Sequence, residues 1–241
     1  MKSSIKLGRI FGIEIGAHLS WIIIATLVLL SLASYFAPTY AWSPLMQWGA
    51  ALLAALLFFG SVITHELGHS LVAQHYGIQV RSITLFLFGG VSQLEGETKR
   101  PSEEFWIAIV GPLTSIAVAI LFSAISVICG LGALIGAVAA WLTGINLALA
   151  IFNLLPGFPL DRGRVLRGLV WWITGNAKKA NRVATETGQI LAIRLNLVFL
   201  HALSAIRLQL HKSEMMSLSY RYSHYAYASS KLVLGRSLHC G

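Results

Sequence analysis

The residues best suited to chemistry are His65, Glu66 and His69, which form the pattern His65-Glu66-Leu67-Gly68-His69. On a helix, residues four apart lie on the same face, so the two imidazoles can bind one divalent metal ion. Glu66 then stands beside the metal, where a carboxylate can take a proton from a metal-bound water. The pattern therefore predicts a metal-dependent hydrolase. The alternative is a histidine pair held only by hydrogen bonds in a helix bundle, which is disfavoured because an unpaired buried carboxylate is costly.

A catalytic zinc ion has three protein ligands and one open position, so a third ligand must come from elsewhere. Of the nine acidic residues, only Glu66 and Asp161 are expected to stand against long apolar runs, and Asp161 is the only aspartate. The sequence therefore favours His65, His69 and Asp161 as metal ligands. The competing third ligands are His18 and His201, and Asp161 has an alternative role as a helix N-cap. The other acids are expected in polar flanks or loops: Glu14, Glu95, Glu97, Glu103, Glu104, Glu186 and Glu214.

The expected chemistry is peptide hydrolysis with one metal ion per chain. The expected metal is zinc, because two nitrogen ligands and one oxygen ligand favour it. Zinc lowers the pKa of a bound water to about 7, and Glu66 is the predicted catalytic residue that accepts its proton. Asn153 is a predicted donor to the oxyanion or to the substrate backbone. Its alternative role is that of an amide in helix packing.

Composition places this chemistry in a membrane. Of the 241 residues, 56% are hydrophobic and only 11% are charged, whereas a soluble domain carries about 25% charged residues. Neither Gly16–Thr64 nor Phe105–Leu160 contains a single Asp, Glu, Lys or Arg. We therefore expect an all-α membrane protein, a polytopic helix bundle of about 4–6 spans. The net charge of +9 comes from basic residues beside apolar spans, so we expect a lipid bilayer as partner and no nucleic acid.

The hydrophobic pattern predicts spans over residues 17–36, 45–76, 104–127 and 133–155, and an amphipathic helix over residues 161–174. After the second span, residues 78–94 predict a short re-entrant β-hairpin, because β-branched and aromatic residues surround Gly89-Gly90. An exposed strand within Ser82–Leu94 can hold an extended substrate by main-chain pairing. The alternative role of this hairpin is to fill the cavity.

Charge also predicts the orientation in the membrane. The N-terminal segment and residues 162–182 are basic, so both are expected on the cytoplasmic side, and the two outer turns lack charge. The second and fourth spans then end on the same side. We therefore expect a cytoplasmic N-terminus and an active site near the cytoplasmic face, reached by both His69 and Asp161.

Taken together, these segments resemble the site-2 protease family of intramembrane zinc metalloproteases. The matching segments are His65–His69, Leu85–Val91, Gly111–Leu113 and Phe152–Asp161, with Ile15–His18 similar to the start of the first span. The resemblance covers residues 8–189. It implies zinc bound by His65, His69 and Asp161, with Glu66 as catalytic residue. It also implies cleavage of the transmembrane segments of membrane-tethered substrates, that is, regulated intramembrane proteolysis, in a bacterial cytoplasmic membrane.

The chain departs from the family in two places. Arg162 stands where relatives usually have glycine, and the sequence after about Ile190 does not match. We therefore expect an intramembrane metalloprotease domain over residues 1–189, followed by a divergent last span and a polar basic tail over residues 190–241. Two other hypotheses are a catalytically impaired membrane scaffold of the same family and a small metal or ion transporter. The intact Glu66 favours the protease, since neither alternative needs a base beside two ligands.

Overall fold

The computed structural model describes residues 4–86, 89–96, 98–154, 162–190, 193–194 and 197. The chain divides into two units, residues 1–189 and 190–241, and the elements below belong to the first. Asp161 and His201 lie outside the described residues, as does the side chain of Arg162.

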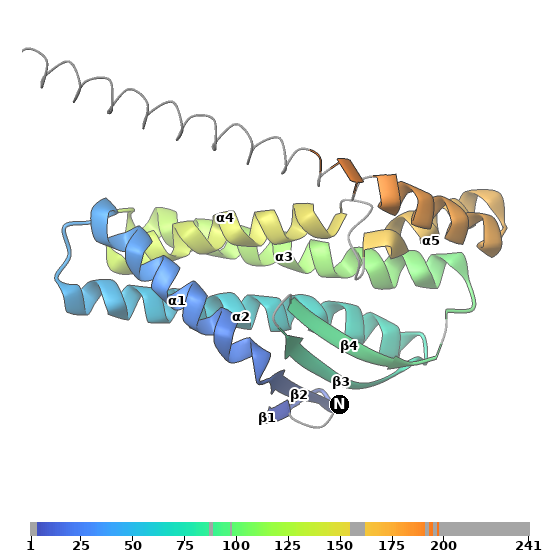
Figure 1. Ribbon diagram of the computed structural model, residues 1–241, viewed down its shortest axis with the longest axis horizontal. Helices are drawn as coiled ribbons and strands as arrows, with labels where there is room; N and C mark the ends of the chain where they lie inside the picture. The colour runs from blue at the N-terminus through green and yellow to red at the C-terminus, as the bar shows by residue number, and fades with distance from the viewer. Residues whose placement is uncertain are drawn as a thin grey trace, which may run out of the picture. The chain divides into compact units, whose positions relative to one another are not determined.

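Four long helices dominate the first unit (Figure 1): α1 (Ser20–Thr39), α2 (Pro44–His75), α3 (Pro101–Cys129) and α4 (Leu134–Leu154). Each is long and apolar enough to cross a membrane. Every predicted span boundary lies within three residues of the observed helix end. The predicted class, a polytopic helix bundle with a hairpin after the second span, is confirmed.

Local sequence sets the helix ends. The Ser43 side chain caps α2 by accepting a hydrogen bond from the Met46 backbone N–H, and Pro44 stands in the first turn, where no backbone donor is needed. Gly130 ends α3 at a φ of +78°, a conformation that favours glycine. The chain then turns back at once into α4, as the sequence predicted.

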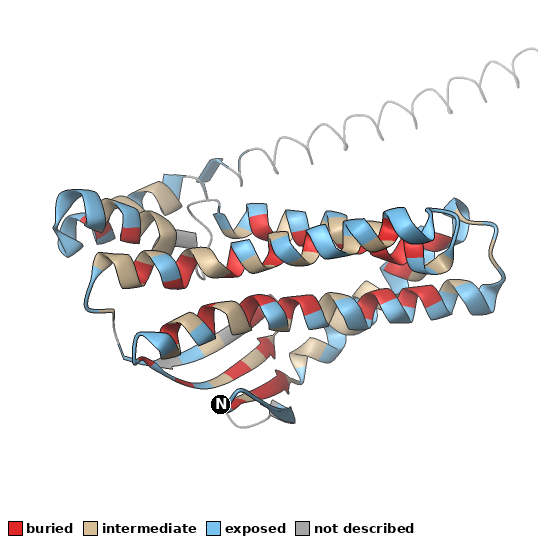
Figure 2. Cartoon of the chain, turned by 180° about the vertical axis from the view of Figure 1, so that it is seen from behind, coloured by how far each residue is buried: buried red, intermediate tan, exposed pale blue. Residues whose placement is uncertain are grey.

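Small side chains let the helices approach one another closely. On α2, the alanines at positions 50, 51, 54 and 55 are buried against Phe36 of α1 and Leu142 of α4. Large apolar side chains point outward instead, and Ile128 of α3 is 82% exposed. Figure 2 shows buried residues on the inward faces of the helices and exposed residues on the outward faces. This distribution suits a bundle whose surroundings are lipid.

A four-stranded sheet lies along the C-terminal half of α2 (Figure 1). Its strands are β1 (Ser4–Ile10), β2 (Ile13–His18), β3 (Gln79–Phe86) and β4 (Gly89–Glu95), in the order β1-β2-β3-β4. The predicted hairpin is the antiparallel pair β3–β4, and β2 pairs with β3 in parallel. The sequence analysis did not predict β1 and β2. The signal in the sequence was the alternation of the apolar residues Ile13, Ile15 and Ala17, which are buried in the structure.

The sheet is fixed to the bundle by an apolar cluster. Ile13, Ile15 and Ile83 pack with Ala73 of α2 and Ile107 of α3. This cluster holds the hairpin beside the part of α2 that carries the histidines. After α4, α5 (Arg162–Thr174) matches the predicted amphipathic helix, and residues 177–190 form a further helix.

Candidate metal centre

His65 and His69 lie one turn apart on α2 and are 3% and 8% exposed. Their Nε2 atoms are 3.2 Å apart, and the two rings are nearly perpendicular, at 78°. Two nitrogen ligands at about 2.0–2.1 Å from one zinc ion have this separation when they subtend about 100° at the metal, which is close to tetrahedral. The pair therefore fits a single zinc ion.

The other nitrogen of each ring contacts α3. Nδ1 of His69 lies 2.6 Å from the carbonyl oxygen of Ile107, and Nδ1 of His65 lies 2.8 Å from Oγ of Ser115. Since a carbonyl oxygen only accepts, Nδ1 of His69 carries the hydrogen and its Nε2 keeps the lone pair that a metal needs. Donation from the second ring nitrogen to a fixed oxygen is typical of metal-binding histidines.

Gly111 lets α3 approach His69. A Cβ atom at position 111 would lie 2.1 Å from Nε2 and 2.4 Å from Cε1 of the His69 ring, a space that no side chain can share. Gly68 on α2 faces the same helix, where an added Cβ would lie 2.6 Å from Oγ1 of Thr114. The close approach of α3 to the His69 ring explains why position 111 is a glycine. In the sequence, Gly111 was notable only as part of a segment that resembles the site-2 protease family.

Glu66 turns toward the hairpin. The side chain is 7% exposed, and its Oε2 accepts a hydrogen bond from Oγ of Ser92 on β4 at 3.0 Å. Oγ of Ser70 in turn donates to Oγ of Ser92 at 3.4 Å. An added Cβ at Gly90 would lie 2.5 Å from Cγ of Glu66, so the hairpin backbone touches the predicted base. The sequence placed Ser92 and Gly90 in the predicted hairpin, but it did not predict their contacts with Glu66.

The structure leaves the predicted third ligand open. Among the described residues, no three side chains of His, Cys, Asp and Glu gather as a metal-binding cluster, and Asp161 and the alternative His201 are outside that part of the chain. The other alternative, His18, lies on β2, where Nδ1 is 2.9 Å from Oγ of Ser20 and the ring stacks on Phe86. Asp161 therefore remains the predicted third ligand.

Asn153 lies half-buried in the last turn of α4. Its Nδ2 donates to the Leu149 carbonyl oxygen at 2.8 Å, a contact within its own helix. This contact is compatible with the alternative role in helix packing, and donation to an oxyanion remains a prediction.

The expectation that Glu104 lies in a polar flank is wrong. The side chain is fully buried on α3, and it forms ion pairs with Arg164 at 3.0 Å and Arg167 at 2.9 Å, both on α5. Thr98 donates a further hydrogen bond to the same carboxylate. The signal in the sequence was the pair of arginines three apart, which share one face of a helix.

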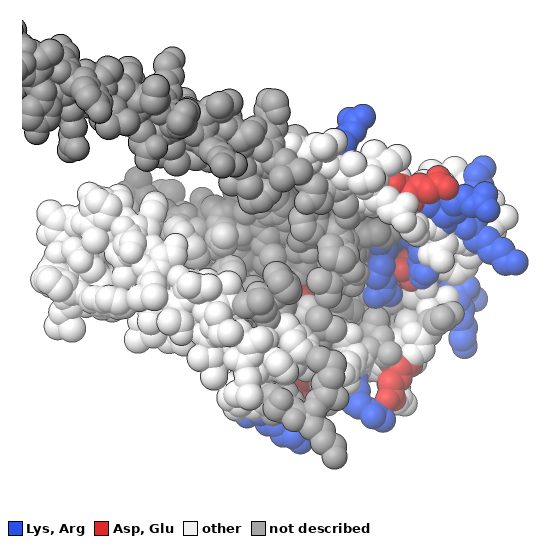
Figure 3. Space-filling model, in the orientation of Figure 1, with Lys and Arg blue, Asp and Glu red and all other residues white. Residues whose placement is uncertain are grey.

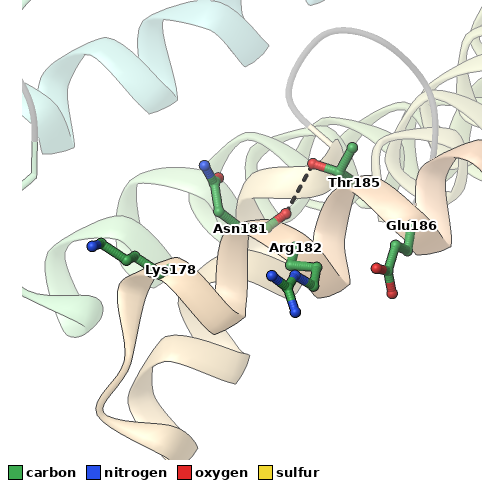
Figure 4. A pocket seen from close by; sticks show the side chains of 5 residues that line it. All are labelled: Lys178, Asn181, Arg182, Thr185 and Glu186. Carbon is green, nitrogen blue, oxygen red and sulfur yellow. Dashed lines mark hydrogen bonds between the residues drawn. The ribbon is translucent and has the colours of Figure 1, made fainter.

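A surface hollow of about 420 Å³ is lined by residues of the helix over residues 177–190 (Figure 4). Oγ1 of Thr185 donates to the Asn181 carbonyl oxygen beside it, and Lys178, Arg182 and Glu186 complete the lining. This hollow runs along the surface of one helix, and its lining includes neither His65 nor His69.

The sequence is similar to those of known metalloproteases. A sequence model of peptidase family M50 matches residues 53–134 and 131–195. A Synechocystis protein named "Putative zinc metalloprotease sll0528" is 44% identical over 189 residues, which are 78% of this chain and 50% of that protein. "Zinc metalloprotease MJ0392" from Methanocaldococcus jannaschii is 34% identical over 86% of this chain and 57% of its own length. The chain thus spans about half the length of these curated relatives.

A solved structure agrees with these sequence matches. The site-2 protease from Methanocaldococcus jannaschii superimposes with a TM-score of 0.57 at 31% identity, covering 85% of this chain and 88% of that one. The zinc-compatible histidine pair thus lies in an apolar bundle of the same fold. The chain belongs to peptidase family M50, the site-2 protease family.

Proposed function

We propose that this protein is a zinc endopeptidase that cleaves transmembrane segments of membrane-tethered substrates. The observation that carries the proposal is the buried pair His65 and His69, with Nε2 atoms 3.2 Å apart, on a helix long enough to cross a membrane. A buried pair of this kind, next to the carboxylate of Glu66, provides two metal ligands and a base.

In the proposed mechanism, His65, His69 and Asp161 would hold one zinc ion, which when bound would supply a Lewis acid for the scissile carbonyl and lower the pKa of a water. Glu66 takes the proton of the attacking water and later donates a proton to the leaving nitrogen. The hydrogen bond from Ser92 holds the Glu66 carboxylate in place for both transfers. Asn153 donates a hydrogen bond to the developing oxyanion.

The hairpin is the proposed substrate clamp. A peptide bond in a transmembrane helix is shielded by the hydrogen bonds of its own helix, so the substrate must be extended before it is cut. β4 stands at the end of the strand order, and its Ser92 contacts Glu66. A substrate strand added to β4 therefore brings its backbone next to the base.

Charge supports an orientation with the site near the cytoplasm. Figure 3 shows Lys, Arg, Asp and Glu side chains gathered at the end formed by α5 and the start of α3, and on the sheet, whereas the opposite end of the visible face is white. The basic side chains there include Arg100, Arg164 and Arg167. Basic residues mark the cytoplasmic side of a membrane protein. We infer an integral protein of a bacterial cytoplasmic membrane, with a cytoplasmic N-terminus.

A reporter assay tests this function. The purified chain in lipid vesicles is given a membrane-tethered reporter, and cleavage is compared for wild type, Glu66→Gln and His65→Ala. We expect Glu66→Gln to keep zinc and lose cleavage, and His65→Ala to lose both. His75→Ala, an exposed histidine on the same helix, is the matched control and should cleave normally. Cleavage that survives Glu66→Gln contradicts the mechanism.

A further inference from the structure

One face of α3 carries four contacts in a row. Ser115 contacts His65, Gly111 makes room for His69, and the Ile107 carbonyl oxygen accepts from His69. Glu104 comes next toward the start of the helix, three residues before Ile107, and therefore lies on the same face. The face that orients the two histidines thus ends in a buried carboxylate that contacts α5.

Glu104 joins α3 to α5 with two ion pairs. Nε of Arg164 lies 3.0 Å from Oε1, and Nη2 of Arg167 lies 2.9 Å from Oε2, so each carboxylate oxygen has its own arginine. The Glu104 side chain is 0% exposed, whereas those of Arg164 and Arg167 are 29% and 35% exposed. Charge-assisted hydrogen bonds to a fully buried carboxylate are short and directional, so they restrict where α5 can lie against α3.

The backbones of the two helices are also in direct contact. An added Cβ at Gly168 of α5 would lie 2.9 Å from the backbone nitrogen of Phe105, so α5 touches the backbone of the first turns of α3. The Phe105 ring meets the Trp172 ring edge-on at 5.9 Å. Apolar packing thus brings α5 against α3, and the ion pairs of Glu104 select one position along that contact.

We propose that Glu104 is a positioning residue of the metal centre. α5 begins at Arg162, the residue directly after Asp161, and consecutive Cα atoms are about 3.8 Å apart. By holding Arg164 and Arg167, Glu104 fixes the start of α5 relative to the α3 face that orients His65 and His69. The inference rests on the proposed function, because it assigns Glu104 to the support of the third ligand.

The test measures two properties of the purified chain in detergent. The first is zinc affinity of the metal-free protein, by competition with a chelator. The second is hydrogen exchange of the α5 amides, also in the metal-free protein. The variant is Glu104→Gln, which removes the charge and keeps the size. Glu103→Gln is the matched control, because Glu103 stands in the same turn but accepts only from the backbone N–H groups of Lys99 and Arg100 in the contacts that the structure gives it.

We expect Glu104→Gln to weaken zinc binding by about 10–100-fold, the range for lost outer contacts of a metal site, and to speed exchange in α5 but not in α4. Glu103→Gln should change neither. If Glu104→Gln does not fold, the double variant Glu104→Gln with Arg167→Gln is measured instead, because it also removes one of the two arginine charges that would lose their partner. Wild-type zinc affinity, or weakened affinity with wild-type exchange in α5, overturns the proposal.

Failure of the inference about Glu104 can be distinguished from failure of the proposed function. If wild type binds zinc and His65→Ala does not, the metal centre stands, and the Glu104 variant then tests the inference alone. If wild type binds no zinc through His65, the proposed function fails, while hydrogen exchange still reports whether Glu104 holds α5.

Discussion

Oγ of Ser92 donates a hydrogen bond to Oε2 of Glu66 across 3.0 Å, so the edge strand β4 holds the predicted base. This contact joins the helix that carries the histidines to the hairpin that the sequence predicted as a substrate clamp. It also makes the hairpin part of the chemistry, because a shift of β4 moves the carboxylate that transfers protons.

Ser92→Ala should lower the turnover number by about 10–100-fold, because a hydrogen bond to a charged group contributes about 1.5–3 kcal/mol. Zinc content should stay at the wild-type level, since Ser92 contacts the base. Reporter cleavage and metal analysis measure the two effects. Ser82→Ala is the control, because Ser82 bonds to Gln93 on the same hairpin. Equal turnover in both variants would show that the Ser92 contact is not used.

Gly111→Ala should abolish zinc binding. The new Cβ would lie 2.1 Å from Nε2 of His69, the atom that we assign to the metal, so the ring must turn away. Gly144→Ala is the control, because an added Cβ there meets nothing within 4 Å. Metal analysis of the two purified variants decides the outcome, and normal zinc content in Gly111→Ala would refute the assigned geometry.

Gly90→Ala should have a different effect, losing cleavage but keeping zinc. Its Cβ would lie 2.5 Å from Cγ of Glu66, so it displaces the base and leaves the imidazoles in place. Gly60→Ala, on the helix that carries Glu66, has open space around the added Cβ and serves as control. Loss of zinc in Gly90→Ala would mean that the hairpin supports the metal itself.

Ser115→Ala should weaken zinc binding by about tenfold, because the contact that orients His65 is lost. The fold should be retained, since alanine suits a helix interior. Ser126→Ala, a second buried serine on α3, is the matched control. Chelator competition gives both affinities, and equal values would remove Ser115 from the metal site.

The sequence could predict the elements whose signals are local. The four apolar helices and the pair His65 and His69 follow from runs and spacing within single segments, and all of these are found. The hairpin also follows from local composition. Each of these elements is predicted from residues within a single segment of the chain.

The remaining features depend on contacts between distant segments. Glu104 looked like a flanking acid because its partner Arg164 stands 60 residues later in the chain. The acceptor for His69 is the backbone carbonyl of Ile107, which carries no side-chain signal. Strand β2 pairs with β3, which is more than sixty residues away, for example through Ile15 and Ile83. Such pairings are set by the assembled bundle and not by local pattern.

Asp161 is proposed to complete the zinc site that His65 and His69 begin, and the zinc content of Asp161→Ala is the decisive measurement. Wild type, Asp161→Ala and the control Glu186→Ala, an exposed acid, are purified identically and analysed for metal. We predict close to one zinc ion per chain in wild type and control, and far less in Asp161→Ala. Full zinc occupancy in Asp161→Ala would show that Asp161 is not a zinc ligand.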